Sequence, residues 1–126
     1  NLLNTTGKTI YVENEKAIDA STAISGSGPA YVFYFMDAMM KAAKEMGFNE
    51  SEAELLVSQT FKGAVDLYNK NNFSCKEWIA KVSSKGGTTE AAMAFYQNES
   101  LSKDIIAGAQ AAFDRAEELG GVSVFK

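Results

Sequence analysis

Apolar residues with helical spacing fill most of the chain, beginning with a strongly apolar stretch at residues 29–46. Pro29 suits its first turn, where a missing N–H costs nothing, and Gly47 is a natural helix end. Residues 30–36 are apolar or aromatic on every face, and a helix of that kind is buried on all sides. Because a domain of short helices can hardly cover it alone, we expect a partner to bury it.

Four more helices are expected downstream, which makes the predicted fold all-α with about five helices. A capping signal at residues 49–52, or alternatively at residues 51–54, opens the second helix, which should end near Asn69. Gly63 lies in its interior, where glycine costs roughly 1 kcal/mol against alanine. We expect the close approach of another helix to compensate for that cost.

The remaining three helices carry their own start and stop signals. Ser74 and Glu77 form a capping box for a short third helix, and a fourth carries the apolar residues 93–96. The last helix should run over about 102–119, with Gly120 as its end.

The first fifteen residues have a different pattern. Thr9–Val12 is a β-branched and aromatic run that follows Gly7, and it predicts a single strand. No second strand is evident from the sequence, and a lone strand must pair with something. We therefore expect its partner in another subunit or in a missing part of the polypeptide, and a start at Asn1 without methionine also suggests a fragment.

Composition narrows the classes of function. With 16 acidic and 12 basic side chains the balance is acidic, which disfavours a nucleic-acid binder. No apolar run approaches the roughly 20 residues that cross a bilayer, so no membrane partner is expected. One cysteine and no histidine argue against a metal site of the usual zinc type and against an imidazole base. Any chemistry must use hydroxyls, carboxylates, lysines, backbone dipoles or a cofactor.

A first glycine-rich motif, Ser25–Tyr31, precedes the apolar helix. A glycine-rich turn that opens a helix can cradle phosphate, but the dinucleotide fingerprint needs a preceding strand and a third glycine. Tyr31 stands at that third position. The alternative interpretation is a tight helix start with close backbone packing.

A second motif, Ser84–Thr89, carries two glycines followed by two threonines at a predicted helix start. Several N–H groups would point into one space there, and the positive end of the helix dipole would help to hold a carboxylate or phosphate. Thr88 or Thr89 is the expected N-cap. The alternative is an ordinary capped helix with a flexible approach.

Taken together, the two motifs resemble the C-terminal domain of pyrroline-5-carboxylate reductase. The resemblance extends over residues 19–119. It rests on five features, which are Ala-Ile-Ser-Gly-Ser-Gly-Pro-Ala-Tyr at 23–31, residues 43–47, Gln59 with Gly63 and Ala64, the Ser-Ser-x-Gly-Gly-Thr-Thr loop at 83–89, and the alanine-rich last helix.

The resemblance implies a division of the chain. Residues 1–15 would be the end of a nucleotide-binding domain and its linker, residues 16–120 the helical dimerisation and substrate-binding domain, and residues 121–126 a tail. Two helical domains would interlock as a homodimer that can assemble into larger rings. The whole enzyme would be cytoplasmic and would transfer hydride from NADPH or NADH to 1-pyrroline-5-carboxylate, a small-molecule substrate, to give L-proline.

The resemblance also implies site residues. The N–H groups of Gly87, Thr88 and Thr89, with the hydroxyl of Ser84, would bind the substrate carboxylate. The Thr89 hydroxyl would hydrogen-bond the ring nitrogen, which makes Thr89 the candidate catalytic residue.

For the cofactor, Glu15 would lie beside substrate and nicotinamide, and Lys81 would contact NADPH or NADH. No metal is implied. One departure stands in the loop, where Lys85 replaces the proline usual in the family. This change should loosen the loop and attract anions.

Two other functions remain open on the sequence. The chain could be a stand-alone helical interaction module whose glycine-rich loops are structural. It could also be the helical half of a related hydroxyacid or opine dehydrogenase, although those enzymes use a catalytic lysine or histidine in that half and no matching motif stands out here.

Overall fold

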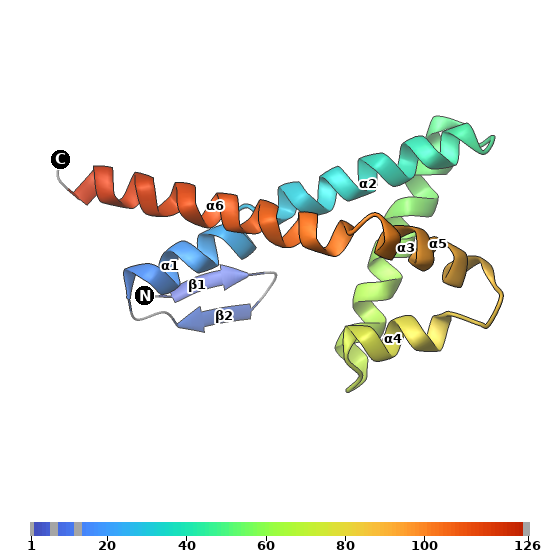
Figure 1. Ribbon diagram of the computed structural model, residues 1–126, viewed down its shortest axis with the longest axis horizontal. Coiled ribbons are helices and arrows are strands. Elements are labelled where there is room, and N and C mark those ends of the chain that lie inside the picture. The colour runs from blue at the N-terminus through green and yellow to red at the C-terminus, as the bar shows by residue number, and fades with distance from the viewer. Residues whose placement is uncertain (1, 6–7, 12–13, 125–126) are drawn as a thin grey trace. The chain divides into compact units, whose positions relative to one another are not determined.

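The computed structural model describes residues 2–5, 8–11 and 14–124, with side chains described over 14–120. The elements in chain order are β1 (Leu2–Thr5), β2 (Lys8–Tyr11), α1 (Glu15–Ser21), the π-helix η1 (Thr22–Gly26), α2 (Gly28–Glu45), α3 (Glu50–Lys70), α4 (Cys75–Val82), α5 (Thr88–Asn98) and α6 (Leu101–Val124) (Figure 1). Helices dominate, which confirms the all-α prediction, and α2 to α6 are the five expected helices. Among the described helices, none is both long and apolar enough to cross a membrane.

The chain divides into two compact units, residues 1–32 with 100–126, and residues 33–99. In the second unit, α2 packs on α3 through the edge of Phe35 against Phe61, with ring centroids 5.7 Å apart. Ala53 and Val57 of α3 are its buried apolar residues. Most other large apolar side chains of this unit remain exposed, which is the expected behaviour of a helix pair that needs a partner.

Capping boxes start two helices of this unit. Asn49 Oδ1 accepts the N–H of Glu52 at 2.9 Å, and Glu52 accepts the N–H of Asn49 at 2.9 Å. Ser74 and Glu77 make the same reciprocal pair at the start of α4, at 3.1 and 2.8 Å. Both boxes were predicted from the sequence, because their partners are only three residues apart.

The first glycine-rich motif forms a tight helix start in the other unit. The N–H of Ser27 donates to the carbonyl of Thr22 at 2.8 Å, which closes the π-helical turn. The hydroxyl of Ser25 donates to the carbonyl of Ser21 at 2.8 Å, and that of Tyr31 donates to the carbonyl of the buried Ala23 at 2.7 Å. Both hydroxyls are therefore bound to backbone carbonyls just before the motif, which agrees with its interpretation as a tight helix start with close backbone packing.

The prediction of a lone strand was wrong. β2 pairs antiparallel with β1, in the register Leu2 with Tyr11 and Thr5 with Lys8. The sequence hid β1, since Leu2–Thr5 has neither alternating polarity nor a β-branched run. The strand therefore gives no evidence for a pairing partner elsewhere. Val12, the last residue of the predicted strand, lies outside the described residues.

The predicted end of the last helix was also wrong. α6 continues past Gly120 to Val124, so residues 121–124 are helical although a tail was expected there. α6 packs beside α1 and η1 in the same unit, and the Cβ position of Gly120 is only 3.8 Å from Asp19 Oδ1. Tertiary contact therefore overrides the local stop signal. Around Gly63, apart from its own stretch of helix, nothing in the described residues lies within 4 Å of its Cβ position, and the close approach of another helix stays a prediction.

Candidate functional site

The second glycine-rich motif begins with a tight turn between α4 and α5. The N–H of Gly87 donates to the carbonyl of Ser84 at 3.0 Å, so residues 84–87 form a four-residue turn. Gly86 has φ +74° in its third position, a conformation that side chains with a Cβ rarely adopt. Lys85 occupies the second position, where turns of this kind favour proline.

Helix α5 starts one residue later than the turn ends. Its N-cap is Gly87 in an extended conformation, and Thr88 and Thr89 are the first two helical residues, so the prediction of a threonine N-cap was wrong. A Cβ on Gly87 would lie 2.6 Å from Ser84 Oγ and 3.1 Å from the Ser84 carbonyl oxygen. Glycine at this position therefore allows the Ser84 hydroxyl to lie directly against the start of the helix.

The first turn of α5 keeps its amide donors available. No side chain caps this helix, and within the described residues the N–H groups of Thr88, Thr89 and Glu90 have no hydrogen-bond acceptor. The N–H of Gly87, by contrast, is used by the turn. Unpartnered amides and the positive end of the helix dipole together favour an anion at this position.

Glu90 belongs to the site and was missed by sequence reasoning. Its Oε1 accepts the N–H of Gly86 at 2.9 Å, which ties the turn to the first helical turn. The signal that could have found it is a glutamate in the third helical position after Gly87, where capping boxes place an acceptor.

The two predicted cofactor residues have surroundings of their own. The Lys81 ammonium is 4.2 Å from the centroid of the Phe73 ring, a cation–π contact at the end of α4. Phe73 in turn packs against the edge of Trp78, with centroids 5.4 Å apart. Glu15 is exposed in the first turn of α1 and belongs to the other unit. The structure thus brings together Ser84 and the start of α5, whereas the cation–π contact of Lys81 is with Phe73.

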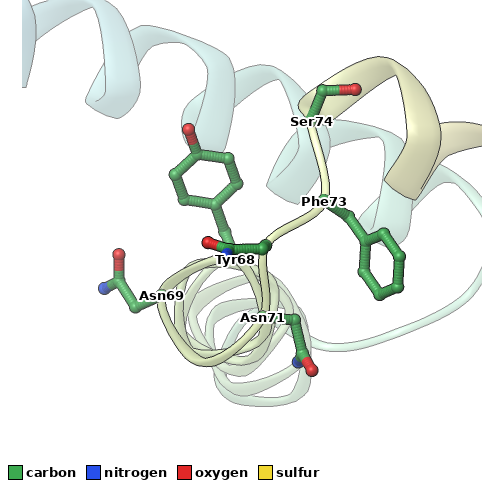
Figure 2. Close-up of a pocket in the computed structure, with 6 residues that line it drawn as sticks. Tyr68, Asn69, Asn71, Phe73 and Ser74 are labelled. Atoms are coloured by element: carbon green, nitrogen blue, oxygen red, sulfur yellow. The ribbon is translucent and has the colours of Figure 1, made fainter.

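A surface hollow at the C-terminal end of α3 is a poor candidate site. It is lined by Tyr68, Asn69 and residues 71–74. Figure 2 shows the rings of Tyr68 and Phe73 pointing to opposite sides of the helix end, with no polar groups converging on a common point. Nor do three or more His, Cys, Asp or Glu side chains cluster as metal ligands anywhere in the described part.

Comparison with known proteins identifies the family. Residues 15–119 match the family described as pyrroline-5-carboxylate reductase dimerisation. The chain is 37% identical over 119 residues to the pyrroline-5-carboxylate reductase of Haemophilus influenzae, which covers 94% of this chain and 44% of that protein.

Two solved structures are also similar. A pyrroline-5-carboxylate reductase from Coxiella burnetii matches with TM-score 0.83 and 39% identity over 87% of this chain and 41% of that chain. Plasmodium falciparum pyrroline carboxylate reductase with NADP bound matches with TM-score 0.84 and 30% identity over 88% and 42%. The chain thus spans less than half the length of these relatives. The family model matches most of the chain, and α5 begins directly after the glycine-rich loop on which the resemblance rests. The chain therefore belongs to the pyrroline-5-carboxylate reductase dimerisation family.

Proposed function

We propose that this chain is the dimerisation and carboxylate-binding half of a cytoplasmic pyrroline-5-carboxylate reductase. The whole enzyme would reduce 1-pyrroline-5-carboxylate to L-proline with NADPH or NADH. The observation that carries the proposal is the uncapped start of α5, where the Thr88 and Thr89 amides lie next to the Ser84 turn in a chain of the reductase family.

The substrate carboxylate fits this position on chemical grounds. Charge-assisted hydrogen bonds from the N–H groups of Thr88 and Thr89 and from the Ser84 hydroxyl would replace the missing N-cap side chain. Gly87 would contribute mainly by lacking a Cβ, since its N–H already donates to Ser84. The Thr89 hydroxyl, one residue into the helix, would orient the ring nitrogen of the bound imine.

The nicotinamide cofactor would be bound mainly by a part of the enzyme outside this chain. Lys81 is an exposed cation held over Phe73, and Glu15 belongs to the other unit. Their roles beside NADPH or NADH therefore rest on the family resemblance alone. We expect the chain by itself to give no turnover with NADPH and 1-pyrroline-5-carboxylate.

A second copy of the chain would be the protein partner. Phe33 and Tyr34 of α2 are 66% and 82% exposed, far more than a packed helix tolerates for aromatic side chains. The same unit also has an apolar groove, lined by Met39, Ala42, Ala43, Met46, Phe48, Leu56, Val57, Thr60 and Phe61. A homodimer would bury such surface, and larger assemblies would build on it.

Light scattering after size exclusion tests the partner. The parent chain should run as a dimer or larger assembly at micromolar concentration. Tyr34→Glu should shift it toward monomer, because it places a charge on a face that is exposed in the single chain and that the dimer would bury. Tyr34→Phe is the matched control, since it keeps the ring at the same position and adds no charge. A well-folded parent monomer would contradict the proposal.

Titration with L-proline, followed by the backbone amide resonances, tests the carboxylate site. The Thr88 and Thr89 amides should shift with L-proline and not with prolinamide, which has no carboxylate, and Ser84→Ala should weaken binding roughly tenfold or more. A dimer that shows no response to L-proline would instead favour the helical interaction module.

A further inference from the structure

Three of the helices in the same unit start with a glutamate in the third helical position, and they use it in two different ways. In α3 and α4, Glu52 and Glu77 accept the N–H of the N-cap residue itself. In α5, Glu90 passes over the N-cap Gly87 and accepts the N–H of Gly86, one residue earlier. Because all three glutamates hold the same helical position, this difference in acceptor geometry comes from the loop that precedes α5.

The consequence for the loop follows from the hydrogen bonds. The N–H of Gly87 is held by the Ser84 carbonyl, and the N–H of Gly86 is held by Glu90. The turn is thus fastened at two consecutive amides, one to its own first residue and one to the first turn of α5. Both bonds keep the Ser84 hydroxyl against the position where Gly87 would carry a Cβ.

A second consequence concerns charge. A carboxylate in the first turn of a helix is drawn to the free amides there, and at α5 these are the amides of Thr88, Thr89 and Glu90 itself. Because Oε1 of Glu90 is bound to Gly86 at 2.9 Å, that oxygen is directed to the turn and not to the threonine amides. The same contact therefore holds the turn that carries the Ser84 hydroxyl and leaves the amides at the start of α5 available to an outside anion.

We infer that Glu90 is a positioning residue for carboxylate recognition, acting through the Gly86 amide on the Ser84 turn. The inference rests on the proposed function, because it takes the start of α5 as the carboxylate site. Glu90 touches no substrate in this scheme. It sets the affinity for the carboxylate by fixing the loop that carries Ser84.

Two variants of Glu90 separate its hydrogen bond from its charge. Glu90→Ala removes both, whereas Glu90→Gln keeps an acceptor oxygen for Gly86 and removes the charge. We expect Glu90→Ala to weaken L-proline binding about threefold to tenfold, the range for losing one ordering hydrogen bond. Glu90→Gln should bind L-proline at least as tightly as the parent, because repulsion between two carboxylates is gone.

Glu52→Ala is the matched control. It removes a glutamate from the same helical position, with the same 2.9 Å acceptor distance to a backbone N–H, in a helix without the glycine loop. A purely structural role for Glu90 predicts that Glu52→Ala and Glu90→Ala lower helix stability alike and that both leave L-proline binding unchanged. The positioning role predicts an affinity loss for Glu90→Ala alone.

Hydrogen exchange at the Gly86 amide gives an independent readout that needs no ligand. Exchange should be faster in Glu90→Ala and unchanged in Glu90→Gln. The inference is overturned if Glu90→Ala binds L-proline like the parent, or if Glu90→Gln loses as much affinity as Glu90→Ala. If the parent itself fails to bind L-proline, the proposed function fails and the inference falls with it. If the parent binds L-proline and the Glu90 variants give either contrary result, the inference alone fails, so the two failures are distinguishable.

Discussion

Gly87→Ala should separate carboxylate binding from folding. The new Cβ would lie 2.6 Å from Ser84 Oγ, closer than real contacts allow, and 3.1 Å from the Ser84 carbonyl oxygen. The hydroxyl is on an exposed side chain and can rotate away, whereas the carbonyl contact requires a shift of only a few tenths of an ångström. The substitution therefore moves the hydroxyl out of the site while the turn survives.

The effect on stability should be small. At φ −90° alanine is unstrained. Replacing glycine by alanine there stabilises the folded protein by about 0.4–1 kcal/mol, because it lowers the conformational entropy of the unfolded chain. Weakening the Gly87 to Ser84 hydrogen bond costs up to about 1 kcal/mol, so the two contributions nearly cancel. Binding is different, since a hydroxyl bond to a carboxylate is worth about 1.5–3 kcal/mol, or roughly ten- to hundredfold in affinity.

A double-mutant cycle is the assay. L-proline titration and urea unfolding are measured for the parent, Gly87→Ala, Ser84→Ala and the double variant. If the alanine acts by displacing the Ser84 hydroxyl, the double variant loses no more affinity than Ser84→Ala alone. Affinity for Gly87→Ala within twofold of the parent, or fully additive losses in the cycle, would refute this reasoning.

Two further predictions concern the loop and α4. Lys85→Pro should raise the free energy of unfolding, measured in urea, by about 0.4–1 kcal/mol. The reason is that the Gly87 to Ser84 hydrogen bond and the φ of +74° at Gly86 define a turn whose second position favours proline. A lower unfolding midpoint would contradict that geometry. The N–H of Ser74 lowers the pKa of Glu77 below its ordinary 4.5, since it binds the ionised carboxylate. A lowered folded-state pKa means that this stabilisation is present above pH 4.5 and is lost as pH falls through the folded value. Thermal unfolding between about pH 5 and pH 3 should therefore lose less stability in Glu77→Gln than in the parent, and equal losses would count against the contact.

Much of the candidate site could be predicted from the sequence. Two glycines and two threonines at a helix start are enough to predict free amides near a positive dipole, and the structure leaves the amides of Thr88 and Thr89 without acceptors among the described residues. The details could not be predicted, because the N-cap position depends on where the turn closes. Closure by Gly87 on Ser84 places the cap at Gly87, one residue before the first predicted position Thr88, and leaves Glu90 to bind the Gly86 amide.

The sequence by itself determined those features whose partners lie three or four residues apart. The capping boxes at Asn49 and Ser74, the all-α class and the apolar surface of α2 follow from side-chain type and spacing alone, because local hydrogen bonds and helical period depend on little else.

The tertiary structure decided what depends on a distant neighbour. Spacing alone could not predict the β1–β2 hairpin or the passage of α6 through Gly120 beside Asp19. In both cases the free energy of packing against another segment outweighs a local preference of about 1 kcal/mol or less.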